Sequence, residues 1–171
     1  MKATTVKYLL LFVAQTALWN YGNFSQYLLL VYLPAMLLCL PISRGPVHTM
    51  AVAFVTGLLM DFLVTGQLGL TSLALVPVAL LRRPVIRLVF GAELFARGEE
   101  LSFHRQGWQK FVLCILLLTA VFLLVFLWAD SAGTRPLWFN AVKFCVSLVA
   151  GTALGMFVAY LMLEESGERW K

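Results

Sequence analysis

Long apolar stretches separated by short polar breaks fill this chain, and they carry more apolar surface than a soluble fold can bury. Hydrophobic residues make up 61% of the 171 residues and charged residues 12%, whereas soluble domains have roughly 45–50% and ~25%. A domain of this size cannot hide that much apolar surface from water. We therefore expect the chain to lie in lipid, which excludes a soluble enzyme, a secreted disulfide scaffold, a disordered tail and a coiled coil.

The apolar stretches predict six membrane-spanning segments, because a helix needs about 20 apolar residues to cross the hydrocarbon layer. The first follows Lys2 and Lys7 but ends without a small-x-small cleavage site, so we interpret it as a retained helix rather than a signal peptide. Pro34 within the second is tolerated in lipid, and the short fourth segment fits a tilted helix or a re-entrant segment. The predicted spans are residues 6–21, 24–42, 46–65, 68–81, 111–129 and 138–163.

The basic residues divide unevenly between the two sides of this map. With both termini in the cytoplasm, eleven of the thirteen lysines and arginines fall on the inner side, and Arg135 and Lys143 are the exceptions. Such an excess is typical of cytoplasmic segments, so the basic charge indicates topology and no nucleic-acid partner is expected. The fourth segment must cross, because otherwise six positive charges between residues 82 and 110 would lie outside. The sequence predicts one all-α integral membrane domain over residues 1–171, with six transmembrane helices and cytoplasmic N- and C-termini.

The long connection between residues 82 and 110 begins with an amphipathic pattern. From Pro84 to Arg97, apolar residues gather on one face and arginines on the other, which favours a short helix in the headgroup layer; an ordinary basic loop is the alternative. We expect Arg82, Arg83 and Arg87 to contact the membrane surface and the cytoplasm, where their charges attract anionic lipid. The polar stretch from residue 99 to residue 106 is typical of an exposed cytoplasmic loop.

Catalytic and metal-binding patterns are missing from the sequence. The two histidines, His48 and His104, form no HExxH motif, and there is no GxSxG motif, phosphate-binding glycine loop or aspartate pair for magnesium. Arg83-Pro84 matches part of a lipid-phosphatase signature, but the lysine that should precede it is absent. The three cysteines lie in apolar runs and are interpreted as core residues. We expect no enzyme activity, no metal and no cofactor.

Two predicted helices each carry small residues at every fourth position, so that these residues share one helix face. The two stripes are Thr49, Ala53, Gly57 and Asp61 in the third span, and Lys143, Ser147, Gly151, Gly155 and Ala159 in the sixth. An antiparallel pairing of the stripes would place Asp61 beside Lys143, and an ion pair would lower the cost of burying either charge. Alternatively, Lys143 snorkels outward and Asp61 faces water or a partner protein. Gly66 and Gly69 predict a tight outer turn after Asp61.

Four short motifs follow one another between residues 27 and 90. They are Tyr27-Leu-Leu-Leu-Val-Tyr-Leu-Pro34, Gly57-Leu-Leu-Met-Asp61-Phe, Gly66-Gln-Leu-Gly69 and Leu81-Arg82-Arg83-Pro84. In order and spacing they resemble the rod shape-determining protein MreD family. In that family an extended stretch with a proline precedes a glycine-x-x-x-aspartate span, and a glycine turn and a span ending in arginine-proline follow. The first span and the last two agree with the family in hydropathy and length.

The resemblance implies a multi-pass protein of the bacterial inner membrane, similar in fold to the substrate-binding subunits of energy-coupling-factor vitamin transporters. It implies a non-enzymatic scaffold of the cell-elongation complex, which supports peptidoglycan synthesis and cell shape. The implied partners are MreC, the actin-like protein MreB, and a glycosyltransferase and transpeptidase pair. Candidate contact surfaces are residues 61–69 outside and residues 82–97 inside, although the connection between residues 82 and 110 is longer than in many members.

Two other functions remain open from the sequence. The substrate-binding subunit of an energy-coupling-factor transporter needs a polar, aromatic-lined pocket near its outer face. Trp19, Tyr21 and Trp138 could line such a pocket, but they fit an interfacial aromatic belt as well, which we prefer. A small membrane enzyme acting on a lipid phosphate would need several charged groups at one depth, and Asp61 and Lys143 are the charged residues found there.

Overall fold

The computed structural model describes residues 2–21, 28–41, 45–91, 107–131 and 137–163, and within these ranges the regular secondary structure is helical, with no strand. This confirms the all-α class. The elements are α1 (Lys2–Tyr21), α2 (Leu33–Leu38), α3 (Pro46–Met60), the π-helical turn η1 (Asp61–Thr65), α4 (Leu70–Phe90), α7 (Trp108–Ser131) and α8 (Leu137–Leu163).

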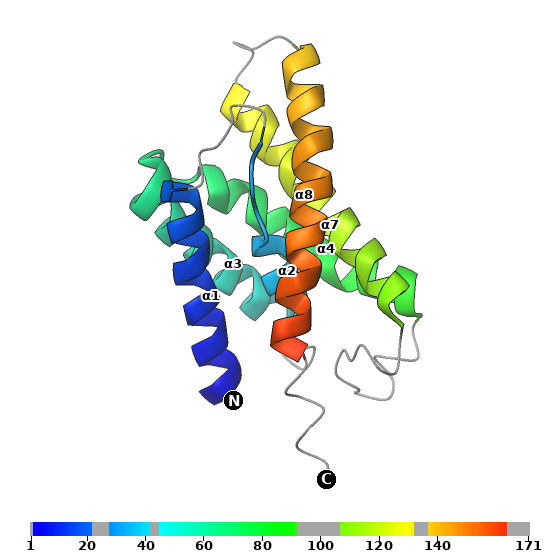
Figure 1. The fold of residues 1–171 in the computed structure, drawn as a ribbon. Coiled ribbons are helices and arrows are strands. Elements are labelled where there is room, and N and C mark those ends of the chain that lie inside the picture. Colours follow the sequence, from blue (N-terminus) through cyan, green and yellow to red (C-terminus); the bar gives the residue numbers. More distant parts are fainter. Residues whose placement is uncertain (1, 22–27, 42–44, 92–106, 132–136, 164–171) are drawn as a thin grey trace.

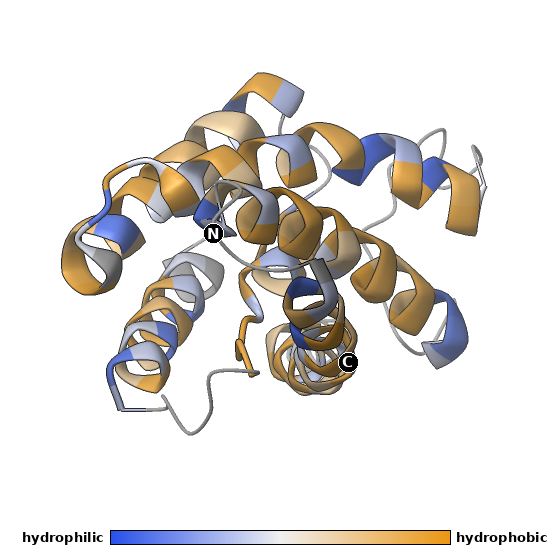
Figure 2. Ribbon diagram, turned by 90° about the horizontal axis from the view of Figure 1, so that it is seen from above, coloured by the Kyte–Doolittle hydropathy of each residue, from blue (hydrophilic) through white to orange (hydrophobic). Residues whose placement is uncertain are grey.

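Three helical stretches are long and apolar enough to cross a membrane. They are Pro46–Val64, Trp108–Ser131 and Trp138–Leu163, and they coincide with the third, fifth and sixth predicted spans to within three residues at each end. The outer surface agrees with a lipid environment, because large apolar side chains on each long helix are exposed, and hydrophobic residues make up most of the helices (Figure 2). These features indicate a membrane protein.

The second predicted span is not one long helix. Residues 28–32 form a non-helical segment, which we call segment 28–32, and only the six residues Leu33–Leu38 are helical. Pro34 lies in the first turn of α2, and its ring would clash with the carbonyl group four residues earlier if the helix extended toward the N-terminus. The rest of the predicted span, residues 24–27 and 42, lies outside the described residues.

The short helix α2 lies at the centre of the molecule. All six of its residues are buried, and it contacts α1, α4, α7 and α8. The helices α3, α4, α7 and α8 pack side by side in chain order, and α1 contacts both η1 and α8. The long helices therefore form a closed ring around α2, with segment 28–32 running straight between α1 and α8 (Figures 1 and 2).

The fourth predicted span, residues 68–81, is part of a longer helix. The helix α4 continues through Pro77 and Pro84 to Phe90, so the separate surface helix predicted to start at Pro84 is wrong. The arginines were expected to end the span, because a charged side chain facing lipid is unfavourable. Arg82 instead points into the protein interior, so the helix continues past it. The remainder of that predicted helix, residues 92–97, and the loop at residues 99–106 lie outside the described residues.

Polar side chains are concentrated inside the molecule, in contrast to the apolar outer surface. Among the described residues, the buried polar or charged side chains are Gln15, Thr49, Thr56, Asp61, Thr71, Ser72, Arg82, Thr119, Ser131, Lys143 and Ser147. Buried polar groups need hydrogen-bond partners, and in lipid every backbone group needs one as well. Several of these side chains form hydrogen bonds with backbone groups of the protein itself.

Candidate functional site

Asp61 caps the first turn of α4 from the end of the preceding helix. Its side chain is fully buried, and its carboxylate accepts the backbone N–H groups of Gly69 at 2.9 Å, Thr71 at 3.0 Å and Ser72 at 3.4 Å. The first N–H groups of a helix have no partner within the helix and carry partial positive charge. The N-terminus of α4 therefore compensates the charge of Asp61.

The turn between η1 and α4 lets Asp61 reach this helix end. Gly66 and Gly69 both have positive φ, 66° and 100°, a conformation that glycine adopts without the steric cost of a side chain. The N–H of Gly66 donates to the backbone carbonyl of Asp61 at 2.8 Å and closes the π-helical turn. The tight turn predicted from these two glycines is present.

Gly57 brings α3 and α4 into direct backbone contact. A Cβ atom at Gly57 would lie 2.5 Å from the Cα of Ser72, so only hydrogen fits there. The Oγ of Ser72 donates to the backbone carbonyl of Phe54 at 3.1 Å and ties the two helices together. Small residues permit this kind of close packing in membranes, and here the partner of the α3 stripe is α4.

The small-residue stripe of α8 also packs inside the molecule, against α7 and the central chain. A Cβ atom at Gly151 would lie 3.0 Å from the carbonyl oxygen of Val31 and 3.2 Å from a methyl carbon of Thr119. Gly155 approaches α7 and α2 in the same way. The predicted antiparallel pairing of the α3 and α8 stripes is therefore wrong. Its physical reason is the non-helical second span, which places segment 28–32 and α2 against α8.

Side chains from α1 and α8 bind the backbone of segment 28–32. The Nε2 of Gln15 donates to the carbonyl of Leu30 at 3.0 Å, and its Oε1 accepts the N–H of Tyr32 at 3.1 Å. The Nε1 of Trp19 donates to the same Leu30 carbonyl at 2.7 Å. From α8, the Oγ of Ser147 accepts the N–H of residue 29 at 2.9 Å. These bonds replace those that a helix would have supplied.

The sequence contains a weak signal for these bonds to segment 28–32. Gln15 is a polar residue in the middle of an apolar stretch, which in a membrane marks a side chain with a specific partner, but no partner was identifiable. Trp19 was interpreted as part of an interfacial belt, and this is wrong, because its indole is buried and its N–H points inward. Tyr21 and Trp138 are exposed, in agreement with the belt interpretation.

Arg82 caps a helix C-terminus, the end of α2. Its guanidinium donates from Nε and Nη2 to the carbonyl of Leu38 at 3.3 and 3.1 Å, and from Nη2 to the carbonyl of Leu40. The last carbonyls of a helix lack partners and carry partial negative charge. Arg82 is only 2% exposed, so the predicted contact of Arg82 with the membrane surface is wrong. Arg83 is partly exposed and Arg87 is exposed.

Lys143 lies near the start of α8 beside the end of α7. Its Nζ is 3.9 Å from a carboxylate oxygen of Asp130, a residue that sequence reasoning did not select. Asp61, the other charge of the predicted pair, is engaged by the first turn of α4 as described above. The structure thus gives each of these two charges a partner on the helix next to it in the ring.

These arrangements are suited to holding backbone in place. In the described part of the chain, no group of three or more His, Cys, Asp or Glu side chains could hold a metal ion. His48 is exposed at the start of α3, and His104 lies outside the described residues. The buried charged residues that were candidates for chemistry interact with the protein itself. Asp61 and Arg82 bind backbone groups, and Lys143 lies beside a carboxylate.

Comparison with known proteins gives no further guide. No family model matches the sequence, and no curated protein and no solved structure matches it.

Proposed function

We propose that the protein is a non-enzymatic inner-membrane scaffold of the bacterial cell-elongation complex, supporting peptidoglycan synthesis and cell shape. The scaffold function is proposed because the buried charges bind helix ends. Asp61 holds the start of α4 and Arg82 holds the end of α2, so both serve the architecture. A protein that assembles other proteins needs a fixed shape and contact surfaces more than reactive groups.

The assignment to cell elongation rests on the four motifs that resemble the MreD family. These motifs also contain the residues that hold the unusual parts of the fold. The first motif covers segment 28–32 and the start of α2. The other three supply the close contact at Gly57, the cap at Asp61 with its glycine turn, and the cap at Arg82. A family defined by these motifs would share these structural devices.

We propose a topology of six crossings with both termini in the cytoplasm. The start of α1 and the end of α8 lie at the same end of the molecule (Figure 1), where the Nζ of Lys7 donates to the carbonyl of Leu161 at 3.2 Å; an even number of crossings requires this. With the rise of extended chain for segment 28–32 and of α-helix for the six residues of α2, the two together advance at most about 25 Å. Segment 28–32 with α2 is therefore long enough for most of the second crossing.

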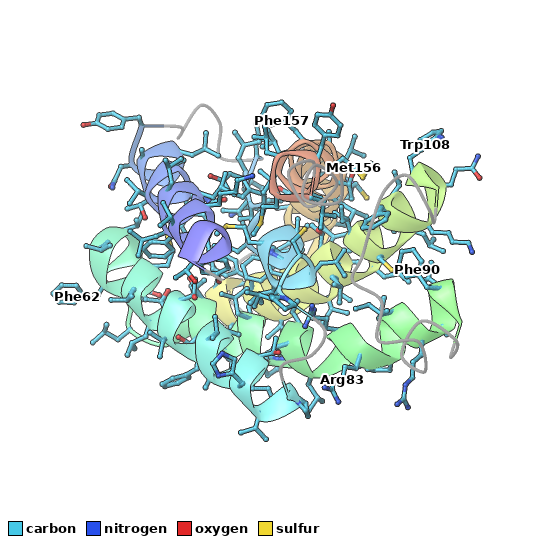
Figure 3. The ribbon with its side chains drawn as sticks, turned by 90° about the horizontal axis from the view of Figure 1, so that it is seen from below. Phe62, Arg83, Phe90, Trp108, Met156 and Phe157 are labelled. Carbon is cyan, nitrogen blue, oxygen red and sulfur yellow. The ribbon has the colours of Figure 1, made fainter. Side chains whose placement is uncertain are left out.

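The proposed partners are MreC, MreB and the glycosyltransferase and transpeptidase pair. A partner helix would not use the GxxxG face of α8, because Gly151 and Gly155 are buried. We propose that it uses the surface around the α3–α4 turn, where Phe62 is 73% exposed and points outward next to Asp61 (Figure 3). Leu68 extends this apolar surface on the other side of the turn.

Purification of a tagged copy from its own host in mild detergent, followed by mass spectrometry, tests the proposal. We expect MreC and the wall synthases to be recovered above the level seen with an unrelated multi-pass protein. Phe62→Ala should lower that recovery several-fold. Phe157→Ala is the matched control, because Phe157 is also an exposed phenylalanine, 62% exposed, but lies on α8.

Two results would contradict the proposal. Recovery of a transmembrane coupling protein with paired ATPases, in place of MreC, would identify a transporter substrate-binding subunit. Normal rod shape and normal wall synthesis after depletion of the protein would exclude a role in cell elongation. Equal loss of MreC with Phe62→Ala and Phe157→Ala would not affect the proposed scaffold function, but it would exclude the α3–α4 turn as the contact surface.

A further inference from the structure

Segment 28–32, α7 and α8 meet at Gly151, in the interior of the molecule. A Cβ atom added to Gly151 would lie 3.0 Å from the carbonyl oxygen of Val31 and 3.2 Å from the methyl carbon of Thr119. Val31 and Thr119 are each only 1% exposed. Because Gly151 has no side chain, a backbone carbonyl and a threonine approach the same point, which we call the Gly151 junction.

The hydroxyl of Thr119 is buried and has no hydrogen-bond partner among the described residues. A threonine inside a helix can donate to the carbonyl four residues earlier, as Thr16 does to Phe12 at 3.0 Å. Thr119 makes no such bond, and its hydroxyl is attached to the same carbon as the methyl group that faces Gly151. A buried hydroxyl without a partner is unfavourable, so this group needs a partner close to the Gly151 junction.

The carbonyl of Val31 is a second polar group without a partner at the Gly151 junction. The neighbouring carbonyl of Leu30 accepts hydrogen bonds from Gln15 and Trp19. Within the described ranges, by contrast, no group donates to the carbonyl of Val31. Backbone groups at membrane depth cannot rely on bulk water, so this carbonyl needs a specific donor. A hydroxyl and a carbonyl that both lack partners therefore lie near one point.

The face of α8 that meets the Gly151 junction is polar toward one end of the helix and apolar toward the other. Lys143, Ser147 and Gly151 lie four residues apart and share this face. Lys143 lies near a carboxylate, and Ser147 accepts an N–H of segment 28–32. One turn beyond Gly151, Gly155 faces side-chain carbon atoms of α7 and α2. The polar part of this face therefore leads from the Lys143 end to the Gly151 junction and ends there.

We infer that the Gly151 junction binds one water molecule between Thr119 and Val31. The water accepts a hydrogen bond from the Thr119 hydroxyl and donates one to the Val31 carbonyl, and a buried water needs about two to four polar partners. A divalent cation would need about six oxygen ligands, which is more than these two groups supply. The water joins α7 to segment 28–32, to which α1 and α8 bind directly. The inference rests on the fold and does not depend on the scaffold role.

Solid-state NMR of the full-length protein in lipid bilayers tests the inference. Val31 and Tyr32 form the only Val–Tyr step in the sequence, so valine labelled with ¹³C at the carbonyl and tyrosine labelled with ¹⁵N give one bonded pair. The rate of magnetisation transfer from water protons to that carbonyl is measured. The reference is the carbonyl of Val146, the only valine followed by serine, which lies within α8 and is selected with ¹⁵N-serine. We expect the transfer to Val31 to be several-fold faster.

Three variants test whether the water depends on Thr119. Thr119→Val replaces the hydroxyl by a methyl group of similar size and should slow the transfer to Val31 several-fold, to the level of Val146. Thr119→Ser keeps the hydroxyl and should retain the fast transfer. Thr152→Val is the matched control, because it removes a threonine hydroxyl of α8 that bonds to the carbonyl of Val149. It should leave the transfer unchanged, and circular dichroism should show the same helix content in all variants.

A crystal structure of the unaltered protein tests the site without any variant. We expect an ordered water within about 3 Å of both the Thr119 hydroxyl oxygen and the Val31 carbonyl oxygen. A hydrogen bond from Thr119 directly to a carbonyl, with no water between them, would overturn the inference. Three NMR outcomes would also overturn it: equal transfer to the two carbonyls in the unaltered protein, fast transfer that persists in Thr119→Val, and equal losses with Thr119→Val and Thr152→Val. These measurements use the isolated protein, so they can fail while MreC is still recovered, and the reverse also holds.

Discussion

The corner from α3 through η1 to α4 and the central stretch from residue 28 to residue 41 both contain backbone groups without a helical partner, and side chains bind these groups in different ways in the two regions. In the corner, Asp61 binds N–H groups that are 8 to 11 residues away in the chain. In the central stretch, the backbone is bound by side chains that are 15, 44 and 118 residues away, from Gln15, Arg82 and Ser147.

This difference indicates which part of the fold a short motif can encode. The corner closes through local contacts, so a few residues around Asp61 specify it almost alone. The central stretch is satisfied only when α1, α4 and α8 are in place around it, and its bonds are distributed over the whole chain. We therefore expect changes in the central stretch to disturb the whole ring, and changes in the corner to disturb chiefly the α3–α4 pair.

Replacement of Arg82 is expected to have the largest effect. Arg82→Met removes the donors from two buried carbonyls, and about 1–3 kcal/mol for each unpaired group lowers the free energy of unfolding by roughly 2–6 kcal/mol. Arg83→Met is the control on the neighbouring, partly exposed arginine, where a change within about 0.5 kcal/mol is expected. Thermal unfolding in detergent, followed by circular dichroism, measures both. Equal effects of the two variants would show that the bonds of Arg82 do not hold α2.

An added methyl group at Gly57 should have the next largest effect. Gly57→Ala places a Cβ atom against the backbone of α4, and overpacking of this kind costs about 1–3 kcal/mol. Gly45→Ala is the matched control, because no atom lies within 4 Å of the new methyl group and Gly45 has a φ of −58°. Thermal unfolding should separate the two variants clearly. If Gly57→Ala were as stable as Gly45→Ala, the corner would not depend on close backbone contact.

The difference between local and distant hydrogen-bond partners also explains which elements could be predicted from the sequence. The helices α7 and α8, and α3 with η1, follow from apolar length, because an isolated helix in lipid is recognised by hydropathy alone. The turn at Gly66 and Gly69 and the importance of Asp61 follow from local pattern. The non-helical second span was missed, because its apolar composition suits a helix equally well and its hydrogen-bond partners lie far away in the chain.

The candidate site was only partly predictable for the same reason. Two adjacent arginines, Arg82 and Arg83, look alike in the sequence, and the position of the end of α2 decides which one is buried. The stripe of α8 was recognised as a packing surface, but its partners could not be identified. Small residues show that a close approach occurs, without showing which element makes it.

Removal of the hydroxyl of Ser147 should have the smallest effect. It tests whether the central stretch depends on α8. Ser147→Ala leaves the N–H of residue 29 without its acceptor, and such bonds in membrane proteins are worth about 0.5–1 kcal/mol. Thr152→Ala on the same helix removes a local bond to the carbonyl of Val149 and serves as the control. Hydrogen exchange of the N–H of residue 29, measured by NMR, should rise with Ser147→Ala and stay unchanged with Thr152→Ala. Unchanged exchange in both variants would mean that segment 28–32 is held from α1 alone, through Gln15 and Trp19, and that its dependence on the distant end of the chain is smaller than the geometry indicates.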